Sequence, residues 1–273
     1  MHVLIIPSEE FIPPESHLAG IFQLHQAKVL TRRGHKVGAL SIKQVYSIPM
    51  LLKGALQRML GMKGSAKLPL GNAFHLIQIL MQRVFVPEES VTEDVVNSIP
   101  VTRIEGVYYC WPSLRFDYLG WVAAGKIAFE AYIRKHGRPD VLHAHNALYA
   151  GLVARSVSRS SGIPYMITEH SSYLARLRYP KPILRRAGLA IADAGSFATV
   201  SESLGRQLTE GLGSCASGWT WIPNVVDPKI EEAPLCEITP STAIRFLAIG
   251  SLIPIKDHAT LIRALAIARS KNP

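Results

Sequence analysis

The chain has 273 residues, of which 48% are hydrophobic and 18% are charged, so it can bury the core of one large or two modest domains. Its formal net charge of +10 favours anionic partners such as phosphates, nucleic acid or an acidic membrane surface, or else simply keeps the protein solvated. The three cysteines are widely spaced and form no C-x-x-C pair, which argues against a disulfide framework or a zinc site and fits a reducing cytosol.

The N-terminal segment predicts a strand, a helix and a second strand. Residues 3–6 form a wholly apolar run that is typical of a buried parallel strand. A helix is expected over residues 17–33, where Gly34 follows two arginines as helix C-termini prefer, and a second strand over residues 36–42. This order predicts an α/β fold with a Rossmann-like, doubly wound parallel sheet.

Residues 46–87 are expected to form a helical insertion. Apolar and basic residues alternate there, with a break near residues 61–71 that contains glycine and proline. Two interpretations stay open for these amphipathic helices. They either pack on the core of their own domain, or they lie on an anionic membrane through an apolar face and a basic rim.

Strands and helices alternate through the rest of the chain. Further strands are expected at residues 101–111, 140–145, 164–168, 197–200 and 219–222. Helices are expected at residues 119–135, at 147–158 before Gly162, from about residue 182, and after Ser201 as N-cap. Residues 225–242 lack periodicity and predict a linker between a domain of residues 1–224 and a segment of residues 243–273. That segment predicts a strand ending at Gly250 and then a helix.

Polar side chains follow four of the predicted strands at their carboxyl ends, where parallel α/β sheets bind ligands. They are His143 and His145, then Glu169 and His170, then Ser201 and Glu202, then Asn224 and Asp227. This convergence predicts a cleft at that edge of the sheet. Its polar residues are expected to be His145, Glu169, Ser201 and Asn224.

The histidines allow more than one role. His143 and His145 share one face of a strand, but no third ligand follows at a diagnostic spacing, so one buried and one cleft histidine are expected rather than a metal site. His170 is either a group that exchanges a proton near neutral pH or a structural histidine. Because neighbours on an extended chain point apart, no direct pair of Glu169 with His170 is expected.

Two further positions suit a phosphate. Gly20 lies near the start of the first helix, where backbone N–H groups can approach an anion closely. Lys256 lies at a loop–helix junction, where its ammonium either meets a diphosphate or is simply solvated, and Asp257 is expected to cap the helix. The chain has no G-x-G-x-x-G or Walker sequence, which argues against a dehydrogenase or a P-loop NTPase.

Six segments, in this order, resemble the retaining GT-B glycosyltransferases of the family 4 type. They are Gly20-Ile-Phe with Ala27-Lys-Val-Leu-Thr-Arg-Arg-Gly-His35-Lys-Val; Arg138-Pro-Asp-Val-Leu-His-Ala-His145; Ile167-Thr-Glu-His170; Ala198-Thr-Val-Ser-Glu-Ser203; Trp221-Ile-Pro-Asn-Val-Val-Asp227; and Ile249-Gly-Ser-Leu-Ile-Pro-Ile-Lys256. Each segment alone matches the family pattern only weakly, but six such segments in the same order make a specific match. Residues 44–118 match least.

The resemblance implies two Rossmann-like domains facing a cleft, with a glycan or lipid-linked acceptor on the N-terminal domain and a nucleotide-sugar donor on the C-terminal one. It implies Gly20 near the donor phosphates and the acceptor, His170 as the catalytic residue beside the transferred sugar, and Lys256 on the donor diphosphate. Anomeric configuration would be retained with no cofactor or bound metal, because basic side chains and helix N-termini offset the leaving charge. A cytoplasmic protein is expected, either free or peripheral on the inner face of the membrane, with no nucleic-acid partner.

Two departures from the family pattern matter. Ser251 stands where the family usually has an arginine, so the donor diphosphate would lose a bidentate cation. The acidic motif of the second domain, with two glutamates, is absent because the sequence stops at Pro273. The resemblance therefore predicts a truncated second domain and little transferase activity for this chain alone.

Two other functions stay open. A nucleotide-sugar epimerase shares the GT-B plan and would change the sugar of its donor without an acceptor. A non-catalytic peripheral membrane or glycan-binding module would use the basic surface and need no donor site.

Overall fold

The structure is a computed structural model and describes residues 1–16, 18–47, 91–108, 117–177, 179–227, 230, 244, 246–250 and 252–271. The chain divides into two compact units, Met1–Glu231 and Glu232–Pro273. The division falls within residues 225–242, where the sequence predicts a linker.

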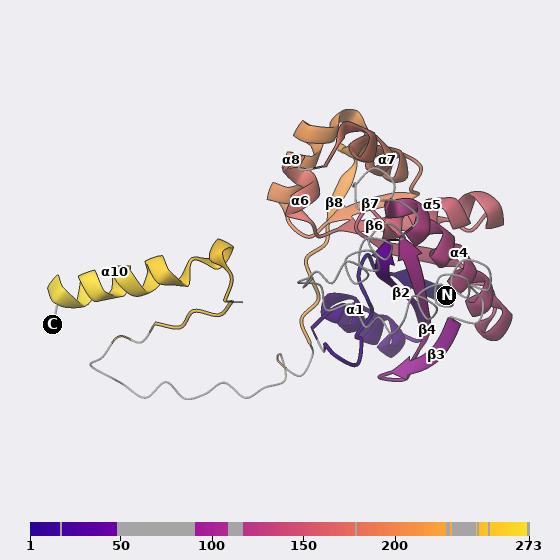
Figure 1. The fold of residues 1–273 in the computed structure, drawn as a ribbon, viewed down its shortest axis with the longest axis horizontal. Coiled ribbons are helices and arrows are strands. Elements are labelled where there is room, and N and C mark those ends of the chain that lie inside the picture. Colours follow the sequence, from indigo (N-terminus) through magenta and orange to yellow (C-terminus); the bar gives the residue numbers. More distant parts are fainter. Residues whose placement is uncertain are drawn as a thin grey trace, which may run out of the picture. The chain divides into compact units, whose positions relative to one another are not determined.

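The first unit is built on an eight-stranded sheet, and every described pair of neighbours except one runs parallel (Figure 1). The strand order is β3-β4-β2-β1-β5-β6-β7-β8. The strands are β1 (His2–Ile6), β2 (Lys36–Ser47), β3 (Val91–Val96), β4 (Ile99–Tyr108), β5 (Val141–His145), β6 (Tyr165–Glu169), β7 (Ser196–Thr199) and β8 (Trp219–Trp221). The expected Rossmann-like parallel sheet is confirmed, with the addition of the antiparallel strand β3 at one edge.

Helices cover both faces of this sheet, and each face has its own apolar core. Helix α1 (Ile21–Arg32) packs through Leu24 and Ala27 against Val3 and Ile5 of β1. The other face is covered by α4 (Asp117–His136), α5 (Ala150–Ser161), α7 (Lys181–Ala192) and α8 (Glu202–Leu212). The described part of the unit also contains a short helix, α6 (Ser172–Ala175), and a 3₁₀ turn, η2 (Gly213–Ala216). Alternate residues of β1 are thus buried on opposite faces, as its unbroken apolar run predicts.

Two parts of the sheet differ from the sequence prediction. Strand β3 was not expected, yet it pairs antiparallel with β4 through a two-residue turn in which Asn97 and Ser98 both have positive φ, 50° and 67°. Such turns match the twist of the paired strands, and Asn is the residue that signals them. Strand β2 continues to Ser47 because it pairs with β4 as far as Tyr108, so residues 46 and 47 are extended rather than helical. The rest of the predicted insertion, residues 48–87, lies outside the described residues.

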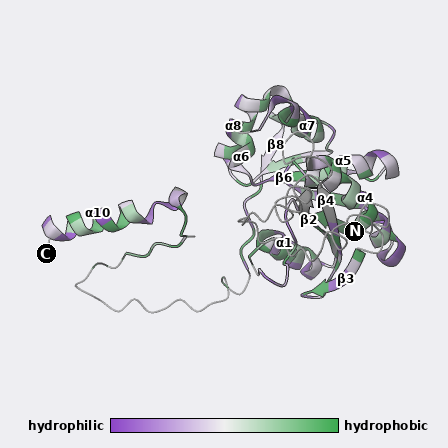
Figure 2. Ribbon diagram, in the orientation of Figure 1, coloured by the Kyte–Doolittle hydropathy of each residue, from purple (hydrophilic) through white to green (hydrophobic). Residues whose placement is uncertain are grey.

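The second unit contains a 3₁₀ turn, η3 (Pro254–Lys256), and α10 (His258–Lys271). Asp257 Oδ1 accepts from the backbone N–H of Thr260 at 3.3 Å, so the predicted cap is confirmed. The strand predicted to end at Gly250 is wrong, since residues 246–250 form no strand and Phe246, Leu247 and Ile249 are exposed. A parallel strand requires a hydrogen-bonded neighbour, and the described part of this unit contains no strand. The hydrophobic residues of α10, green in Figure 2, are likewise exposed.

Helix α1 lies between two glycines in the left-handed region: Gly20, its N-cap, has φ 75°, and Gly34, which follows the C-cap Arg33, has φ 81°. Because Gly20 is not helical, the helix starts at Ile21, later than the predicted residue 17, and Leu18 in the preceding loop is 78% exposed. A Cβ on Gly20 would lie 3.1 Å from Phe11 Cα and 3.2 Å from the carbonyl oxygen of Glu10, whereas a Cβ on Gly34 would meet nothing within 4 Å.

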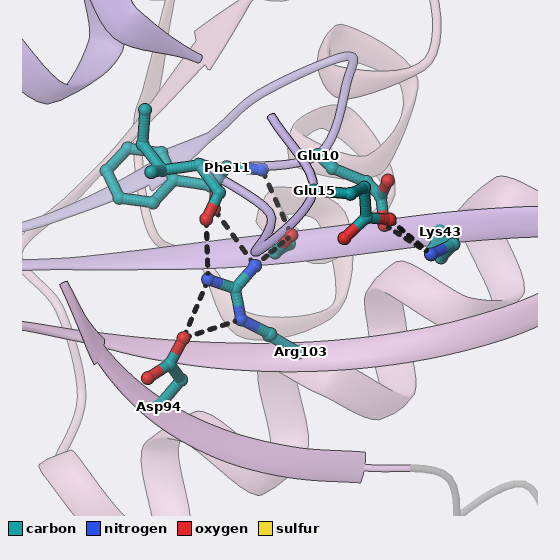
Figure 3. A network of polar contacts seen from close by, with 8 residues as sticks. Glu10, Phe11, Glu15, Lys43, Asp94 and Arg103 are labelled. Atoms are coloured by element: carbon teal, nitrogen blue, oxygen red, sulfur yellow. Dashed lines mark hydrogen bonds and ion pairs between the residues drawn. The ribbon is translucent and has the colours of Figure 1, made fainter. Parts of the chain in front are cut away.

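The loop between β1 and α1 is held to the sheet by Arg103 of β4 (Figure 3). Its guanidinium donates to the carbonyl oxygens of Phe11 and Ile12 at 2.9 and 3.0 Å, and to Asp94 Oδ2 at 2.8 and 2.9 Å. A further contact reaches Ser41 Oγ at 3.2 Å. The hydrogen bonds from Arg103 lower the pKa of the Asp94 carboxyl. One mostly buried cation therefore fixes the loop that leads into α1.

We predict that Gly20→Ala destabilises the protein more than Gly34→Ala. Both changes place Cβ at a positive φ, which costs about 1–2 kcal/mol. Only Gly20 is also crowded by rigid backbone, which adds about 1–3 kcal/mol. Urea unfolding of both variants measures the difference. Equal losses of unfolding free energy would contradict the crowding seen at Gly20.

We also predict that Arg103→Met lowers the unfolding free energy by about 2 kcal/mol, because it leaves two part-buried carbonyls and a carboxylate without their donor. Arg206 is the control, since it makes an exposed ion pair with Glu202 at 3.1 Å within α8. Arg206→Met should cost at most about 0.5 kcal/mol. Denaturant titrations that give similar losses for the two variants would remove the anchoring role of Arg103.

Candidate active site at the carboxyl edge of the sheet

The sheet reverses its direction of growth between β1 and β5. From β1 the chain adds β2 on one side, and later adds β5 and β6 on the other. In open α/β sheets, ligands bind beyond the carboxyl ends of the two strands where the order reverses. Here these ends are followed by Ser8 after β1 and Asn146 after β5, and Asn146 Nδ2 donates a hydrogen bond to Ser8 Oγ.

Asn146 joins three strand ends, and sequence reasoning missed it. Besides its bond to Ser8, its Oδ1 accepts from the backbone N–H of His170 at 2.9 Å, and its own N–H donates to the carbonyl oxygen of Thr168 at 2.8 Å. Its φ of 76° lies in the left-handed region, which Asn tolerates better than most residues. An asparagine directly after a predicted strand was the available signal. The backbone of His170 is thus held from β5.

The histidines of β5 form a ladder with β6 on the face of the sheet that α1 covers. His143 Nε2 lies 2.8 Å from Thr168 Oγ1, and His145 Nδ1 lies 2.9 Å from His170 Nε2. The rings of His143 and His145 are 4.3 Å apart, and those of His145 and His170 stack at 5.1 Å. The predicted shared face of His143 and His145 is confirmed. Both are buried, so the expected cleft position belongs to the half-buried His170 instead of His145.

All three imidazoles are neutral near pH 7. Burial lowers the pKa of His143 and of His170 to about 4, and it lowers that of His145 well below its usual value. His145 Nε2 is buried without a hydrogen-bond partner among the described residues. His170 Nδ1 is also buried and has no well-formed hydrogen bond there, although the Asn224 side chain interacts with this ring and raises its pKa.

Glu169 lies on the opposite face from His170 and does not bond its imidazole. Its carboxylate accepts from the backbone N–H groups of Ala147 and Ser171, each at 2.8 Å, and it lines a cavity of about 190 Å³. Burial raises the pKa of Glu169 to about 7, while the backbone N–H donors pull it down. The residue therefore ties the loops after β5 and β6 together, and the expected absence of a direct pair with His170 is confirmed.

The other predicted residues of the first unit have different environments. Gly20 is the residue before α1, and its N–H donates to Glu9 Oε1 at 3.3 Å, so a carboxylate of the chain itself stands near that helix end. Phe22 of the same helix stacks on His170 at 6.4 Å, which brings the start of α1 to the histidine. Ser201 caps α8, since its Oγ accepts from the N–H of Leu204 at 3.2 Å. Of the predicted set, the structure therefore brings together His145, His170, Asn224 and the helix that follows Gly20.

The donor residues predicted in the second unit stay untested. Lys256 is exposed at the end of η3. Ser251 lies outside the described residues. Neither is placed relative to His170.

A second cavity of the first unit, of about 460 Å³, lies beside the loop that Arg103 anchors. Its lining includes Glu10 and Glu15 of that loop, Lys43 of β2 and Glu105 of β4. Lys43 Nζ lies 2.8 Å from Glu15 Oε1 and 3.6 Å from Glu10 Oε1. Figure 3 shows the Lys43 side chain pointing toward these two glutamates. These residues were not predicted from the sequence, because only the register of β2 with β4 brings them to one place.

Two further properties concern the described residues alone. They contain no group of three or more His, Cys, Asp or Glu side chains arranged to hold a metal ion. None of their helices is both long enough and apolar enough to cross a bilayer.

Comparison with solved structures gives matches of low identity. The catalytic domain of starch synthase IV from Arabidopsis thaliana, bound to ADP and acarbose, is 15% identical with a TM-score of 0.46, over 84% of this chain and 52% of that one. UDP-N-acetylglucosamine 2-epimerase from Rickettsia bellii is 13% identical with a TM-score of 0.42, over 85% and 47%. The chain thus spans about half the length of these proteins. No curated protein matches its sequence.

Comparison with protein families gives a match over most of the described site. The sequence model of Glycosyltransferase Family 4 matches residues 81–230, more than half of the chain. The matched range contains β5 to β8, the histidine ladder, Asn146 and Asn224. The chain therefore belongs to glycosyltransferase family 4 and carries a Rossmann-like fold of the GT-B kind.

Proposed function

We propose that this protein transfers a sugar from a nucleotide-sugar donor to a glycan or lipid-linked acceptor, with retention of anomeric configuration. The first unit would hold the acceptor, and His170 would act as the catalytic residue beside the transferred sugar. The observation that carries the proposal is the placement of His170 after β6, directly beside the switch point between β1 and β5, in a chain of family 4. Both its backbone and its imidazole are fixed there, by Asn146 and His145.

The chemistry available to His170 is hydrogen bonding. Because burial lowers its pKa to about 4, the imidazole stays neutral and is a weak base near pH 7. A neutral, oriented N–H can support an oxygen of the transferred sugar while positive charge develops at the anomeric carbon. A protonated ring would instead repel that charge. The site thus favours electrostatic positioning over proton transfer.

The solved structures support the class of donor. The matched starch synthase domain is bound to ADP, and the matched epimerase acts on a UDP-sugar according to its name. We infer that the donor for this chain is a nucleotide-sugar as well. In the same proposal Lys256 would neutralise the donor diphosphate, helped by helix N-termini instead of a metal. Because Ser251 stands where the family usually has an arginine, one cation fewer would neutralise the diphosphate.

The acceptor would be rich in hydroxyl groups. The cavity of about 460 Å³ offers the carboxylates of Glu10, Glu15 and Glu105 and the ammonium of Lys43. Carboxylates accept hydrogen bonds from hydroxyls, and an ammonium donates to them. A glycan, or the sugar of a lipid-linked acceptor, matches this lining better than an apolar ligand does.

We predict that His170→Ala lowers kcat of transfer by about 100-fold or more, because it removes an oriented donor next to the reacting sugar. The assay uses the chain alone and the chain joined to the nucleotide-sugar domain of another family member, with donor and acceptor saturating. His35→Ala is the control, because His35 precedes β2 at the amino edge of the sheet. A His170→Ala variant with wild-type kcat would show that His170 is not catalytic.

Product analysis separates this function from that of an epimerase. A transferase forms a labelled product only when acceptor is present, whereas an epimerase converts the sugar of its donor alone.

Flotation with anionic vesicles at low salt tests the separate expectation that residues 46–87 bind a membrane. Failure to float would remove a peripheral membrane location.

A further inference from the structure

Residues 222–227, which we call the strap, lead from β8 toward α1 across the carboxyl edge of the sheet (Figure 1). The backbone N–H of Ile222 donates to the carbonyl oxygen of Thr199, the last residue of β7, at 3.0 Å. At the other end of the strap, Asp227 contacts α1, which packs on β1. Strands β7 and β1 are three strand spacings apart, about 14 Å, whereas five Cα–Cα steps reach at most about 18 Å. The strap therefore passes over the carboxyl ends of β6 and β5, which lie between them.

Asp227 is held on α1 by two side chains. Its Oδ2 lies 3.4 Å from His25 Nε2 and 3.4 Å from Lys28 Nζ. His25 and Lys28 are three residues apart in the helix, so they are neighbours on its surface. The side chains of His25, Asp227 and Lys28 are only 14%, 20% and 26% exposed. Solvent therefore screens this contact less than it screens an ion pair on the open surface.

The strap passes beside His170. Asn224, in the middle of the strap, interacts through its side chain with the His170 imidazole. Phe22 of α1 stacks on the same ring at 6.4 Å, and it precedes His25 by three residues, which is about one helical turn. The contact of the strap with α1 is thus close to the contact of α1 with His170. Because most of the strap is exposed, burial does little to fix it, and its place depends on the contacts at its ends.

We propose that Asp227 is a positioning residue, whose contact with α1 holds the strap over the carboxyl edge of the sheet and keeps Asn224 at the His170 ring. The inference rests on the proposed function only for its consequence in catalysis. A carboxylate suits this role, because one of its oxygens accepts from an ammonium and from an imidazole at the same time. Loss of the carboxylate releases that end of the strap from α1. Asn224 then moves relative to the imidazole, and the surroundings of the catalytic group change.

The chain offers matched variants for a test. Asp227→Ala removes the carboxylate, Asp227→Glu keeps it, and Lys28→Met removes the ammonium from α1. Asp193→Ala is the control, because Asp193 Oδ2 likewise lies 2.8 and 2.9 Å from two basic residues of one helix, Arg155 and Arg159 of α5. Asp193 follows α7 and precedes β7, so it lies at the opposite, amino edge of the sheet. Urea unfolding shows whether each variant is folded.

The first readout is the ring signals of His170 in ¹H–¹⁵N correlation spectra of the histidine-labelled chain, assigned by their loss in His170→Gln. Asp227→Ala should move these signals in the direction in which Asn224→Ala moves them, and Lys28→Met should do so by a smaller shift. Asp227→Glu and Asp193→Ala should leave them in place. Signals that are unchanged in folded Asp227→Ala, or that move as far in Asp193→Ala, overturn the proposal. If Asp227→Ala does not fold, the spectrum of Lys28→Met decides in its place.

Kinetics separate this inference from the proposed function. In an active transferase, Asp227→Ala should lower kcat by about 10-fold or more, because it disturbs the group beside the reacting sugar, while Asp227→Glu recovers most of the loss and Asp193→Ala keeps wild-type kcat. In the His170→Ala background, Asp227→Ala should cost no further activity, because a positioning residue acts through the group it positions. Wild-type kcat in folded Asp227→Ala, or losses that multiply in the double variant, would overturn the positioning role. By contrast, wild-type kcat in His170→Ala would overturn the proposed function and leave the anchoring of the strap, which the spectra measure, standing.

Discussion

The candidate site depends on the hydrogen bonds of one side chain, that of Asn146. It reaches Ser8 after β1, and it holds the backbone N–H of His170 after β6. Three strand ends that are distant in sequence are thereby kept in one arrangement at the switch point of the sheet. The left-handed backbone at Asn146 allows this, because it turns the chain away from β5 while the amide stays among the strand ends. Without this junction, the backbone N–H of His170 would lose its acceptor, and the loop would depend on the imidazole of His170 and on the carboxylate of Glu169.

The register of β5 with β6 then decides which side chains meet. Because both strands are parallel and alternate their side chains, His143 lies beside Thr168, and His145 beside His170. Glu169 falls on the other face and bonds backbone N–H groups there. Polar residues that would be costly in the core are thus paired across one strand boundary. Within the described part of the chain, Nε2 of His145 and Nδ1 of His170, at the end of the ladder, have no well-formed hydrogen bond.

Much of this arrangement follows from local rules that a sequence displays. The period of two places His143 and His145 on one face, a serine before an apolar helix predicts the cap at Ser201, and glycine after arginines marks the end of α1. The pairing of strands that are distant in sequence cannot be predicted from such local patterns. Strand β3 depends on its partner β4, the cavity beside Lys43 depends on register, and the apolar run before Gly250 stays without a strand for lack of a partner. The role of Asn146 could be predicted only in part. An asparagine after a strand indicates a turn, but it does not indicate the hydrogen bonds to Ser8 and His170.

The neutrality of His170 limits which mechanism the site can support. Protonating a group of pKa about 4 at pH 7 costs about 4 kcal/mol, at 1.36 kcal/mol for each pKa unit. This cost argues against His170 as a group that exchanges a proton near neutral pH, which is one of the two roles that the sequence suggests. It suits a reaction in which positive charge develops on the sugar, because an imidazolium would oppose that charge while a neutral N–H donor does not. Burying the histidine ladder costs desolvation free energy. The same burial keeps His170 neutral, which is the electrostatic property that the proposed chemistry requires.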